Sequence, residues 1–147
     1  LDTAPFIYLI EEDETFLPIV EPVFAAIDGG RIVAVPSALT LLEVLVVPLR
    51  AADVALARRY EALLAGSRGL EFVDVSRAVL RDAATLRAAT AMRTPDAIQI
   101  ATALHRGCTS FVTNDRAIPT LPGLAILRLS DFLPRRAARR TPRVSER

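Results

Sequence analysis

The chain has 147 residues, of which 52% are hydrophobic and 24% are charged, and its formal net charge at pH 7 is +1. This composition excludes wholesale disorder, and the length suits a single domain that buries its own core. The single cysteine excludes an internal disulfide, and with one histidine there is no cysteine–histidine cluster for zinc. We therefore expect one domain in a reducing, cytoplasmic environment.

The N-terminal residues do not resemble a secretory signal, because no basic segment precedes the apolar residues and the chain turns acidic at residues 11–14. The apolar run that follows Arg31 nears the length of a membrane span, but Pro36, Glu43 and Pro48 interrupt it. A buried core element is the better interpretation of this run, so we expect no membrane partner.

Helical and strand patterns alternate along the chain. Residues 1–3 predict the end of a strand whose beginning precedes Leu1. Helices are predicted at residues 4–13, 17–30, 38–47, 52–69, 76–92 and 94–107, and strands at 31–35, 70–75, 110–113 and 125–129. Ser37 and Thr94 are predicted N-caps, and Pro48 is expected to end its helix because proline disfavours helical geometry in the preceding residue.

Apolar strands that alternate with helices favour an α/β fold, a three-layer α/β/α sandwich with a central parallel sheet and right-handed crossovers. No internal repeat or linker divides the chain. We expect one domain over residues 1–134, followed by a basic tail over residues 135–147. The tail is interpreted as a flexible, solvated end, and an arm that contacts RNA is the alternative.

Glu43 is the only charged residue between Arg31 and Arg50. A carboxylate in so apolar a run requires a partner, because an unpaired ion is costly to remove from water. Ser37, Thr40 and Glu43 recur at every third position and form one polar stripe on the predicted helix. The stripe predicts that Glu43 faces a polar site rather than the core.

Three aspartates are placed to join Glu43. Asp2 ends the first strand, Asp96 opens a helix and Asp115 follows the strand at residues 110–113. Because active sites of parallel sheets collect at the carboxyl ends of the strands, we expect all four carboxylates to converge on one cleft. Four such groups repel one another unless a cation neutralises them, and oxygen ligands without histidine or thiolate suit Mg²⁺ or Mn²⁺.

Each carboxylate also has a simpler interpretation. Asp96 is well placed to interact with the positive end of a helix dipole, and Asp115 is typical of a turn or cap. Pairing with an arginine from another element is the alternative for Glu43, and Asp2 alone says little. The position of all four at strand ends or adjacent helix positions is what favours the metal site.

Four segments of the chain, in order, carry a resemblance to a known family: LDTAPFIYLIEED, PSALTLLEVLV, TPDAIQIATALHRGC and FVTNDRAI. Together they resemble the PIN-domain ribonucleases, specifically the VapC-type toxins of bacterial toxin–antitoxin modules. The resemblance covers nearly the whole chain. It departs from the family in the first strand, of which only the end is present, and in the additional tail.

The resemblance implies an endoribonuclease that depends on Mg²⁺ or Mn²⁺. Its catalytic and metal-binding set would be Asp2, Glu43, Asp96 and Asp115, and Thr3 and Thr113 would orient these carboxylates or a water. The resemblance also implies a homodimer and a cognate antitoxin whose C-terminal segment occupies the active-site groove.

An RNA substrate agrees with the charge pattern, because all 18 basic residues are arginines and they outnumber the acidic residues outside the predicted site. Two other functions remain open. The first is a catalytically silent PIN-like module that binds RNA or protein. The second is a phosphohydrolase for small substrates, which the single aspartate of LDTAP disfavours because the haloacid-dehalogenase type begins with Asp-x-Asp.

Overall fold

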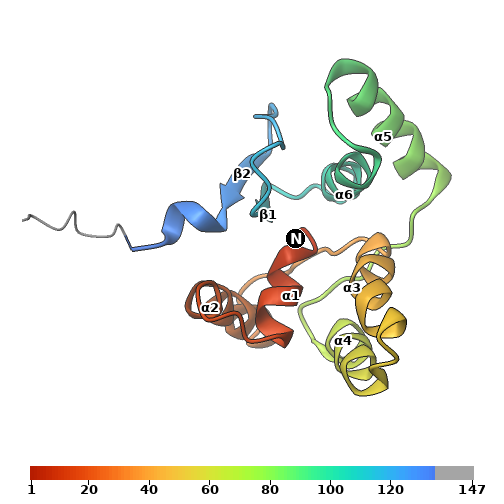
Figure 1. Ribbon diagram of the computed structural model, residues 1–147. Coiled ribbons are helices and arrows are strands. Elements are labelled where there is room, and N and C mark those ends of the chain that lie inside the picture. Colours follow the sequence, from red (N-terminus) through yellow and green to blue (C-terminus); the bar gives the residue numbers. More distant parts are fainter. Residues whose placement is uncertain (135–147) are drawn as a thin grey trace, which may run out of the picture.

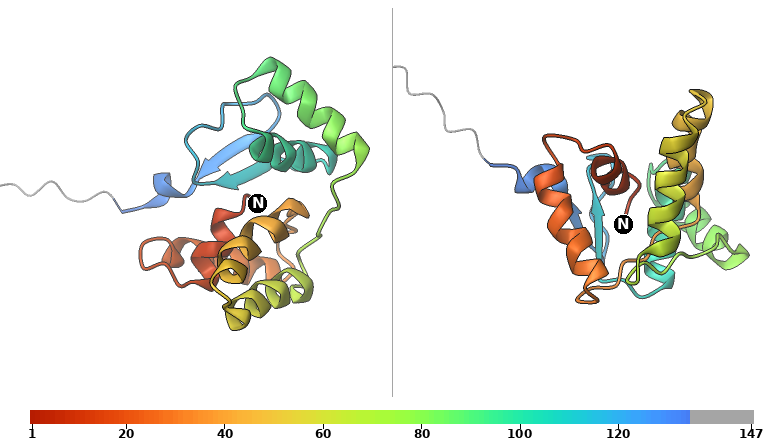
Figure 2. Two further views of the ribbon diagram at one scale, coloured as in Figure 1. Left: turned by 45° about the vertical axis from the view of Figure 1, so that its right-hand side comes forward. Right: turned by 90° about the horizontal axis from the view of Figure 1, so that it is seen from below.

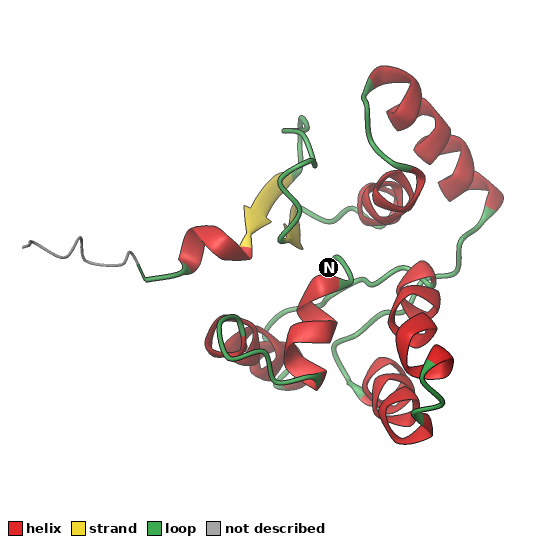
Figure 3. Ribbon diagram, in the orientation of Figure 1, coloured by secondary structure: helices red, strands yellow, loops and turns green. Residues whose placement is uncertain are grey.

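The computed structural model describes residues 1–134, in which helices are the main element (Figure 3). The elements in chain order are α1 (Ala4–Ile10), α2 (Leu17–Asp28), α3 (Leu39–Arg50), α4 (Val54–Gly66), α5 (Arg77–Ala89), α6 (Thr94–His105), β1 (Ser110–Thr113), β2 (Ala125–Arg128) and the 3-10 helix η1 (Leu129–Phe132). All six predicted helices and the last two predicted strands are present, with small shifts at their ends. The basic tail predicted at 135–147 lies outside the described residues.

The predicted parallel pairing is observed between β1 and β2, where Ser110 lies opposite Ala125. The strands expected at residues 31–35 and 70–75 are not continuous and meet only at isolated parallel bridges, such as Ala34 with Leu70. The α/β architecture with a parallel sheet is therefore confirmed. The full three-layer sandwich stays a prediction, because the sheet within residues 1–134 has two strands.

Helices cover both faces of β1 (Figures 1 and 2). Successive side chains of a strand point to opposite faces, so Phe111 joins the apolar cluster that α5 and α6 build, including Ile100. Val112 packs against the cluster of α1 to α4, which includes Phe6 and Ile27. The alternation places the carboxyl end of β1 between the two helical groups, where the predicted site residues lie.

Helix α3 corrects one boundary, since it continues through Pro48 to Arg50 instead of ending at residue 47. A proline in the last turn removes only one helical hydrogen bond, and the Pro48 carbonyl still accepts from the Asp53 N–H at 2.8 Å. At the other end, the N-cap position belongs to Ala38 and not to the predicted Ser37, although the Ser37 hydroxyl accepts from the Leu39 N–H at 3.3 Å. Neither α3 nor any other helix within residues 1–134 is long and apolar enough to cross a membrane.

Helix α6 corrects a second boundary. Thr94 is its first helical residue, and the N-cap position belongs to Arg93, whose backbone is extended with φ −69° and ψ 156°. The helix leads into Gly107, whose φ of +68° turns the chain toward β1. The shift by one residue leaves Asp96 in the first turn, where it interacts favourably with the helix dipole.

Helix α1 is held against α4 by a hydrogen bond between side chains. The Tyr60 hydroxyl donates to the Glu11 carboxylate at 2.5 Å, and Arg59 donates to the Ile10 carbonyl at 2.6 Å. Burial, followed by the hydrogen bond to Glu11, raises the pKa of Tyr60 above its ordinary range. These contacts fix the far end of α1, whose first turn follows Asp2 and Thr3.

Candidate active site

Asp2 is held at the carboxyl end of β1 by its backbone and its side chain. Its N–H donates to the Val112 carbonyl at 2.9 Å. One carboxylate oxygen accepts from the buried Thr113 hydroxyl at 2.6 Å, and the other accepts from the Thr3 N–H at 2.7 Å. Asp2 is therefore fixed beside the strand that leads to Asp115.

Glu43 projects from α3 toward the same region. Its Oε2 atom accepts a hydrogen bond from the Thr3 hydroxyl and another from the Gln99 amide at 3.1 Å. Among residues 1–134, no arginine pairs with Glu43. The Glu43 carboxylate is instead held by Thr3, the residue before α1, and by Gln99 of α6. The alternative of an arginine partner is therefore not observed.

Gln99 is the buried centre of this arrangement, with 3% of its surface exposed. Its Nε2 atom lies 3.2 Å from the Thr3 hydroxyl, 3.1 Å from the Thr40 hydroxyl and 3.1 Å from Glu43. Its Oε1 atom is buried and has no hydrogen-bond partner in the described part of the chain. Gln99 thus joins α6, α3 and the start of α1 at one point.

Asp96 and Asp115 share one cation, the guanidinium of Arg93. Arg93 donates to Asp96 at 2.9 and 3.4 Å and to Asp115 at 2.7 Å. The hydrogen bond to Asp96, with the charges of both aspartates, raises the pKa of Arg93. The Asp96 side chain is only 12% exposed, whereas that of Arg93 is 70% exposed. The Arg93 guanidinium therefore lies on the solvent side of the largely buried Asp96 carboxylate.

A continuous set of contacts links the elements that carry the four carboxylates. Thr113 donates to Asp2 and accepts from the Asp115 N–H at 3.0 Å. Asp115 shares Arg93 with Asp96, which lies one turn before Gln99 on α6, and Gln99 reaches Glu43. The side chains form two connected pairs, Asp2 with Glu43 through Thr3 and Asp96 with Asp115 through Arg93.

This arrangement differs from the predicted cluster in one respect. Within residues 1–134, no three histidine, cysteine, aspartate or glutamate side chains lie close enough together to hold a metal ion as they stand. Two of the carboxylates face a guanidinium instead. The convergence of all four on one shared metal ion therefore stays a prediction.

Comparison with known protein families shows to which family the chain belongs. A family model described as the PIN domain matches residues 1–124. The chain belongs to the PIN-domain family. Among curated proteins, none matches the chain in sequence.

Two solved structures share the fold of this PIN domain. A toxin–antitoxin complex from Klebsiella pneumoniae has 20% sequence identity and a TM-score of 0.61, over 84% of this chain and 92% of that chain. VapBC2 from Rickettsia felis, bound to a DNA fragment from their promoter, has 16% identity and a TM-score of 0.55, over 86% of this chain and 94% of that chain. Identities this low establish similarity of fold alone.

The donor atoms of the PIN domain site are suited to a hard divalent cation. The hydrogen-bonded side chains of the site offer carboxylate and hydroxyl oxygens, and none of them is a histidine or a cysteine. The guanidinium between Asp96 and Asp115 also indicates that this pair accepts a positive charge. The chemistry of the residues therefore fits Mg²⁺ or Mn²⁺ once the Arg93 guanidinium moves away from Asp96 and Asp115.

Asp96 and Asp115 also have the simpler roles that the sequence suggested, in addition to their place in the site. Asp96 lies in the first turn of α6, as expected of a helix-dipole partner. Asp115 accepts from the Ala117 N–H at 2.7 Å, as expected of a turn residue. Both oxygens of Asp96 and the other oxygen of Asp115 contact Arg93, so neither role excludes participation in the PIN domain site.

Sequence reasoning missed two residues that build this part of the PIN domain. Arg93 precedes Asp96 by three positions, a spacing typical of ion pairs in helices, but 18 arginines offer many such candidates. Gln99 follows Asp96 by three positions and so shares its helix face. An amide in the otherwise apolar stretch AIQIA is the signal that points to a buried polar role for Gln99.

Proposed function

We propose that this PIN domain is a divalent-metal-dependent endoribonuclease that hydrolyses RNA phosphodiester bonds. We further propose that it is the toxin of a type II toxin–antitoxin module and acts in the cytoplasm. The observation that carries the proposal is the set of contacts that ties Asp2, Glu43, Asp96 and Asp115 to one end of β1 and α6. PIN domains are generally nucleases, which supports the same reaction class.

In this proposal the four carboxylates hold Mg²⁺ or Mn²⁺. The bound ion supplies positive charge that activates a water and stabilises the leaving oxygen of the phosphodiester. Thr113 fixes one oxygen of Asp2, and Thr3 with Gln99 fixes one oxygen of Glu43. These neighbours restrict the rotation of the carboxylates, which lowers the cost of arranging them around a cation.

The surface charge supports RNA as the substrate. The chain carries 18 arginines against 17 acidic residues, and four of the acidic residues belong to the proposed metal site. The excess of arginine elsewhere attracts phosphates, whereas the site itself admits them only when a cation offsets its carboxylates.

The proposed partners rest on the similar structures. One is a toxin–antitoxin complex and the other is VapBC2, so each pairs a toxin with an antitoxin. We propose on this basis a cognate antitoxin for this chain. That its C-terminal segment covers the active-site groove, and that the PIN domain forms a homodimer, are proposals that rest on the family resemblance alone.

Metal dependence tests the reaction. The purified protein is expected to cut total cellular RNA in the presence of Mg²⁺ or Mn²⁺, and excess EDTA is expected to stop the cutting until the metal is restored. Mapping the new RNA 5′ ends shows whether cuts are internal. Cleavage that continues unchanged in EDTA contradicts the metal mechanism, because carboxylates alone do not activate water in this way.

The Arg93 bridge favours a second candidate function, a catalytically silent module that binds RNA or protein. A guanidinium that already offsets one of the two negative charges of Asp96 and Asp115 reduces the need of these carboxylates for a metal ion. The two functions differ in whether a divalent ion displaces Arg93.

The Arg93→Ala variant separates these functions. If the site binds metal, removal of the competing guanidinium is expected to tighten Mn²⁺ binding about fivefold, a modest change because the Arg93 side chain is 70% exposed and water screens its charge. Isothermal titration calorimetry of the RNA-free protein measures this affinity. Arg81→Ala, which removes a charge from α5, is the control and should bind Mn²⁺ as the unmodified chain does. Absence of Mn²⁺ binding in all three proteins favours the silent module.

A further inference from the structure

The guanidinium of Arg93 lies in an excess of negative charge. It donates to Asp96 through Nε at 2.9 Å and to Asp115 through Nη2 at 2.7 Å. One positive charge therefore faces two negative charges, and one negative charge remains. Such a group attracts a further cation, because each carboxylate keeps part of its attraction for one.

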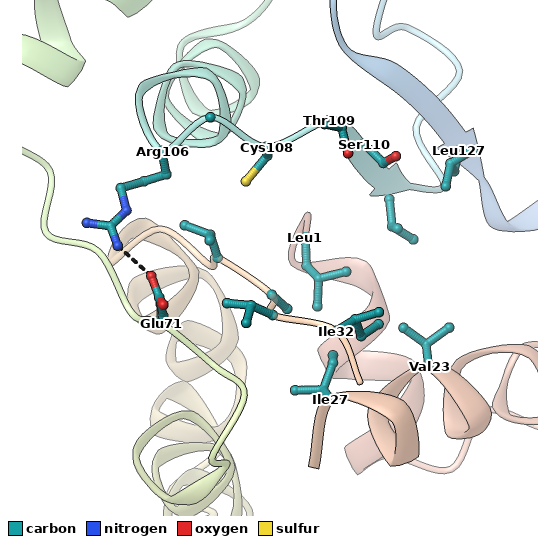
Figure 4. Close-up of a pocket in the computed structure, with 15 residues that line it drawn as sticks. Leu1, Val23, Ile27, Ile32, Glu71, Arg106, Cys108, Thr109, Ser110 and Leu127 are labelled. Atoms are coloured by element: carbon teal, nitrogen blue, oxygen red, sulfur yellow. Dashed lines mark hydrogen bonds and ion pairs between the residues drawn. The ribbon is translucent and has the colours of Figure 1, made fainter. Parts of the chain in front are cut away.

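The ion pair at the other end of α6, beside an open pocket, is balanced by comparison (Figure 4). Arg106, the C-cap residue of α6, pairs with Glu71 alone, and their side chains are 44% and 50% exposed. One cation meets one anion there, so the pair has little attraction for another ion. Arg93 and Arg106 thus lie at opposite ends of one helix, and only Arg93 faces unbalanced carboxylates.

Arg93 is held weakly, on the solvent side of the two aspartates. Its side chain is 70% exposed, and its Nη1 atom makes no hydrogen bond in the described part of the chain. Exposed ion pairs are weak because water screens them. The aspartates are more firmly placed, since Asp115 also accepts from the Ala117 N–H and Asp96 is buried in the first turn of α6. The guanidinium can therefore leave while the carboxylates stay.

Arg93 loses its attraction to the aspartates once a divalent cation offsets their charge. Its backbone remains at the N-cap of α6, so the released guanidinium stays close to the site. A guanidinium has five N–H donors in one plane, and this geometry matches two oxygens of a phosphate. The released side chain is thus suited to an anionic substrate.

A second arginine adjoins the same carboxylates. Arg116 directly follows Asp115, is exposed, and has no acidic partner within residues 1–134. Its guanidinium lies 3.5 Å from the Ser130 hydroxyl. The carboxylates of this part of the site are buried or half-buried and the arginines beside them are exposed. This order suits a cation on the inside and a phosphate on the outside.

We propose that Arg93 is a phosphate-binding residue, which exchanges Asp96 and Asp115 for an RNA phosphate when a divalent cation binds these aspartates. The inference rests on the proposed nuclease function and adds to it that Arg93 binds RNA only in the metal-bound protein. Without metal the guanidinium stays with the aspartates, whose remaining negative charge repels a phosphate. Metal and RNA therefore bind cooperatively through one side chain.

Fluorescence anisotropy of a labelled, single-stranded RNA of mixed sequence tests this exchange. The full chain is titrated into the RNA in EDTA and in saturating Ca²⁺, which also prefers carboxylate oxygens. Ca²⁺ should tighten RNA binding by the unmodified chain, and Arg93→Ala should reduce this gain about tenfold, although the same variant tightens Mn²⁺ binding. Arg93→Lys keeps the charge and should reduce the gain only about threefold. Arg106→Ala, the matched control at the other end of α6, should keep the full gain.

A gain in Arg93→Ala that equals or exceeds that of the unmodified chain overturns the proposal, because Arg93 then only competes with the cation. Melting temperatures in EDTA check that each variant folds, and Arg93→Gln replaces Arg93→Ala if the latter does not. If Ca²⁺ supports cutting, the RNA concentration at half-maximal initial rate replaces anisotropy and should rise about tenfold in Arg93→Ala.

The same experiment separates this inference from the nuclease proposal. An unmodified chain that binds neither Ca²⁺ nor Mn²⁺ overturns both. An unmodified chain that cuts RNA with Mn²⁺, together with an undiminished gain in Arg93→Ala, overturns the role of Arg93 alone.

Discussion

Asp96→Asn is expected to lower the rate of RNA cleavage at least about a thousandfold, because it removes a metal-binding charge while it preserves the size of the side chain. Asp96 is the most buried of the four carboxylate residues, with 9% of its surface exposed. It also lies in the first turn of α6, one turn before the buried Gln99. A neutral amide at this position removes one negative charge and one anionic oxygen from the set that would hold a divalent ion.

The fold should tolerate this change. The amide oxygen of the introduced asparagine can still accept from Arg93, and Arg93 keeps its bond to Asp115 at 2.7 Å. The melting temperature without metal should therefore shift by no more than about 3 °C. Asp131→Asn, at an exposed position of η1, is the control and should cleave RNA at the unmodified rate. Cleavage by Asp96→Asn within about tenfold of the unmodified rate contradicts a catalytic role for this carboxylate.

The elements near the site were predictable because their signals are local. Pro95 and Gly107 mark the two ends of α6 in sequence, and the apolar stretch SFVT predicts β1 at the residues where the structure has it. The positions of Asp96 and Asp115 then follow, since each lies at a fixed distance along the chain from one of these elements. The rule that sites form at the carboxyl ends of parallel strands then predicts that these two aspartates lie near each other.

The contacts of the site were less predictable because they depend on tertiary structure. Gln99 and Thr3 are 96 positions apart, and the spacing of apolar residues along the sequence does not predict that their side chains meet. The strand patterns at 31–35 and 70–75 illustrate the same limit. Alternation predicts which residues prefer an extended backbone, whereas a continuous ladder also requires a neighbouring strand that stays in register along its length. One edge of residues 33–35 faces a cavity, and only isolated bridges form.

Gln99→Leu is expected to reduce the free energy of unfolding by about 2 kcal/mol and the melting temperature by about 6 °C. Leucine fills a similar volume but donates no hydrogen bond. The Thr40 hydroxyl is fully buried, and its only hydrogen bond within residues 1–134 is the one to Gln99. Glu43 loses its amide donor as well, so two polar groups remain poorly satisfied away from water.

Gln99→Glu provides the matched comparison, since it keeps the shape of the side chain and replaces the amide donor by a carboxylate. At about pH 7.5 the two acidic groups of Glu43 and residue 99 repel each other, which raises the pKa of the new carboxyl and destabilises the fold more than leucine does. Below about pH 5 the new carboxyl binds a proton and donates to Glu43, so its deficit should shrink as the pH falls. Thermal melts at both pH values measure the difference. A Gln99→Leu melting temperature equal to that of the unmodified chain would show that the amide does not hold α3 and α6 together, and Glu43 would then have to be positioned by Thr3 alone.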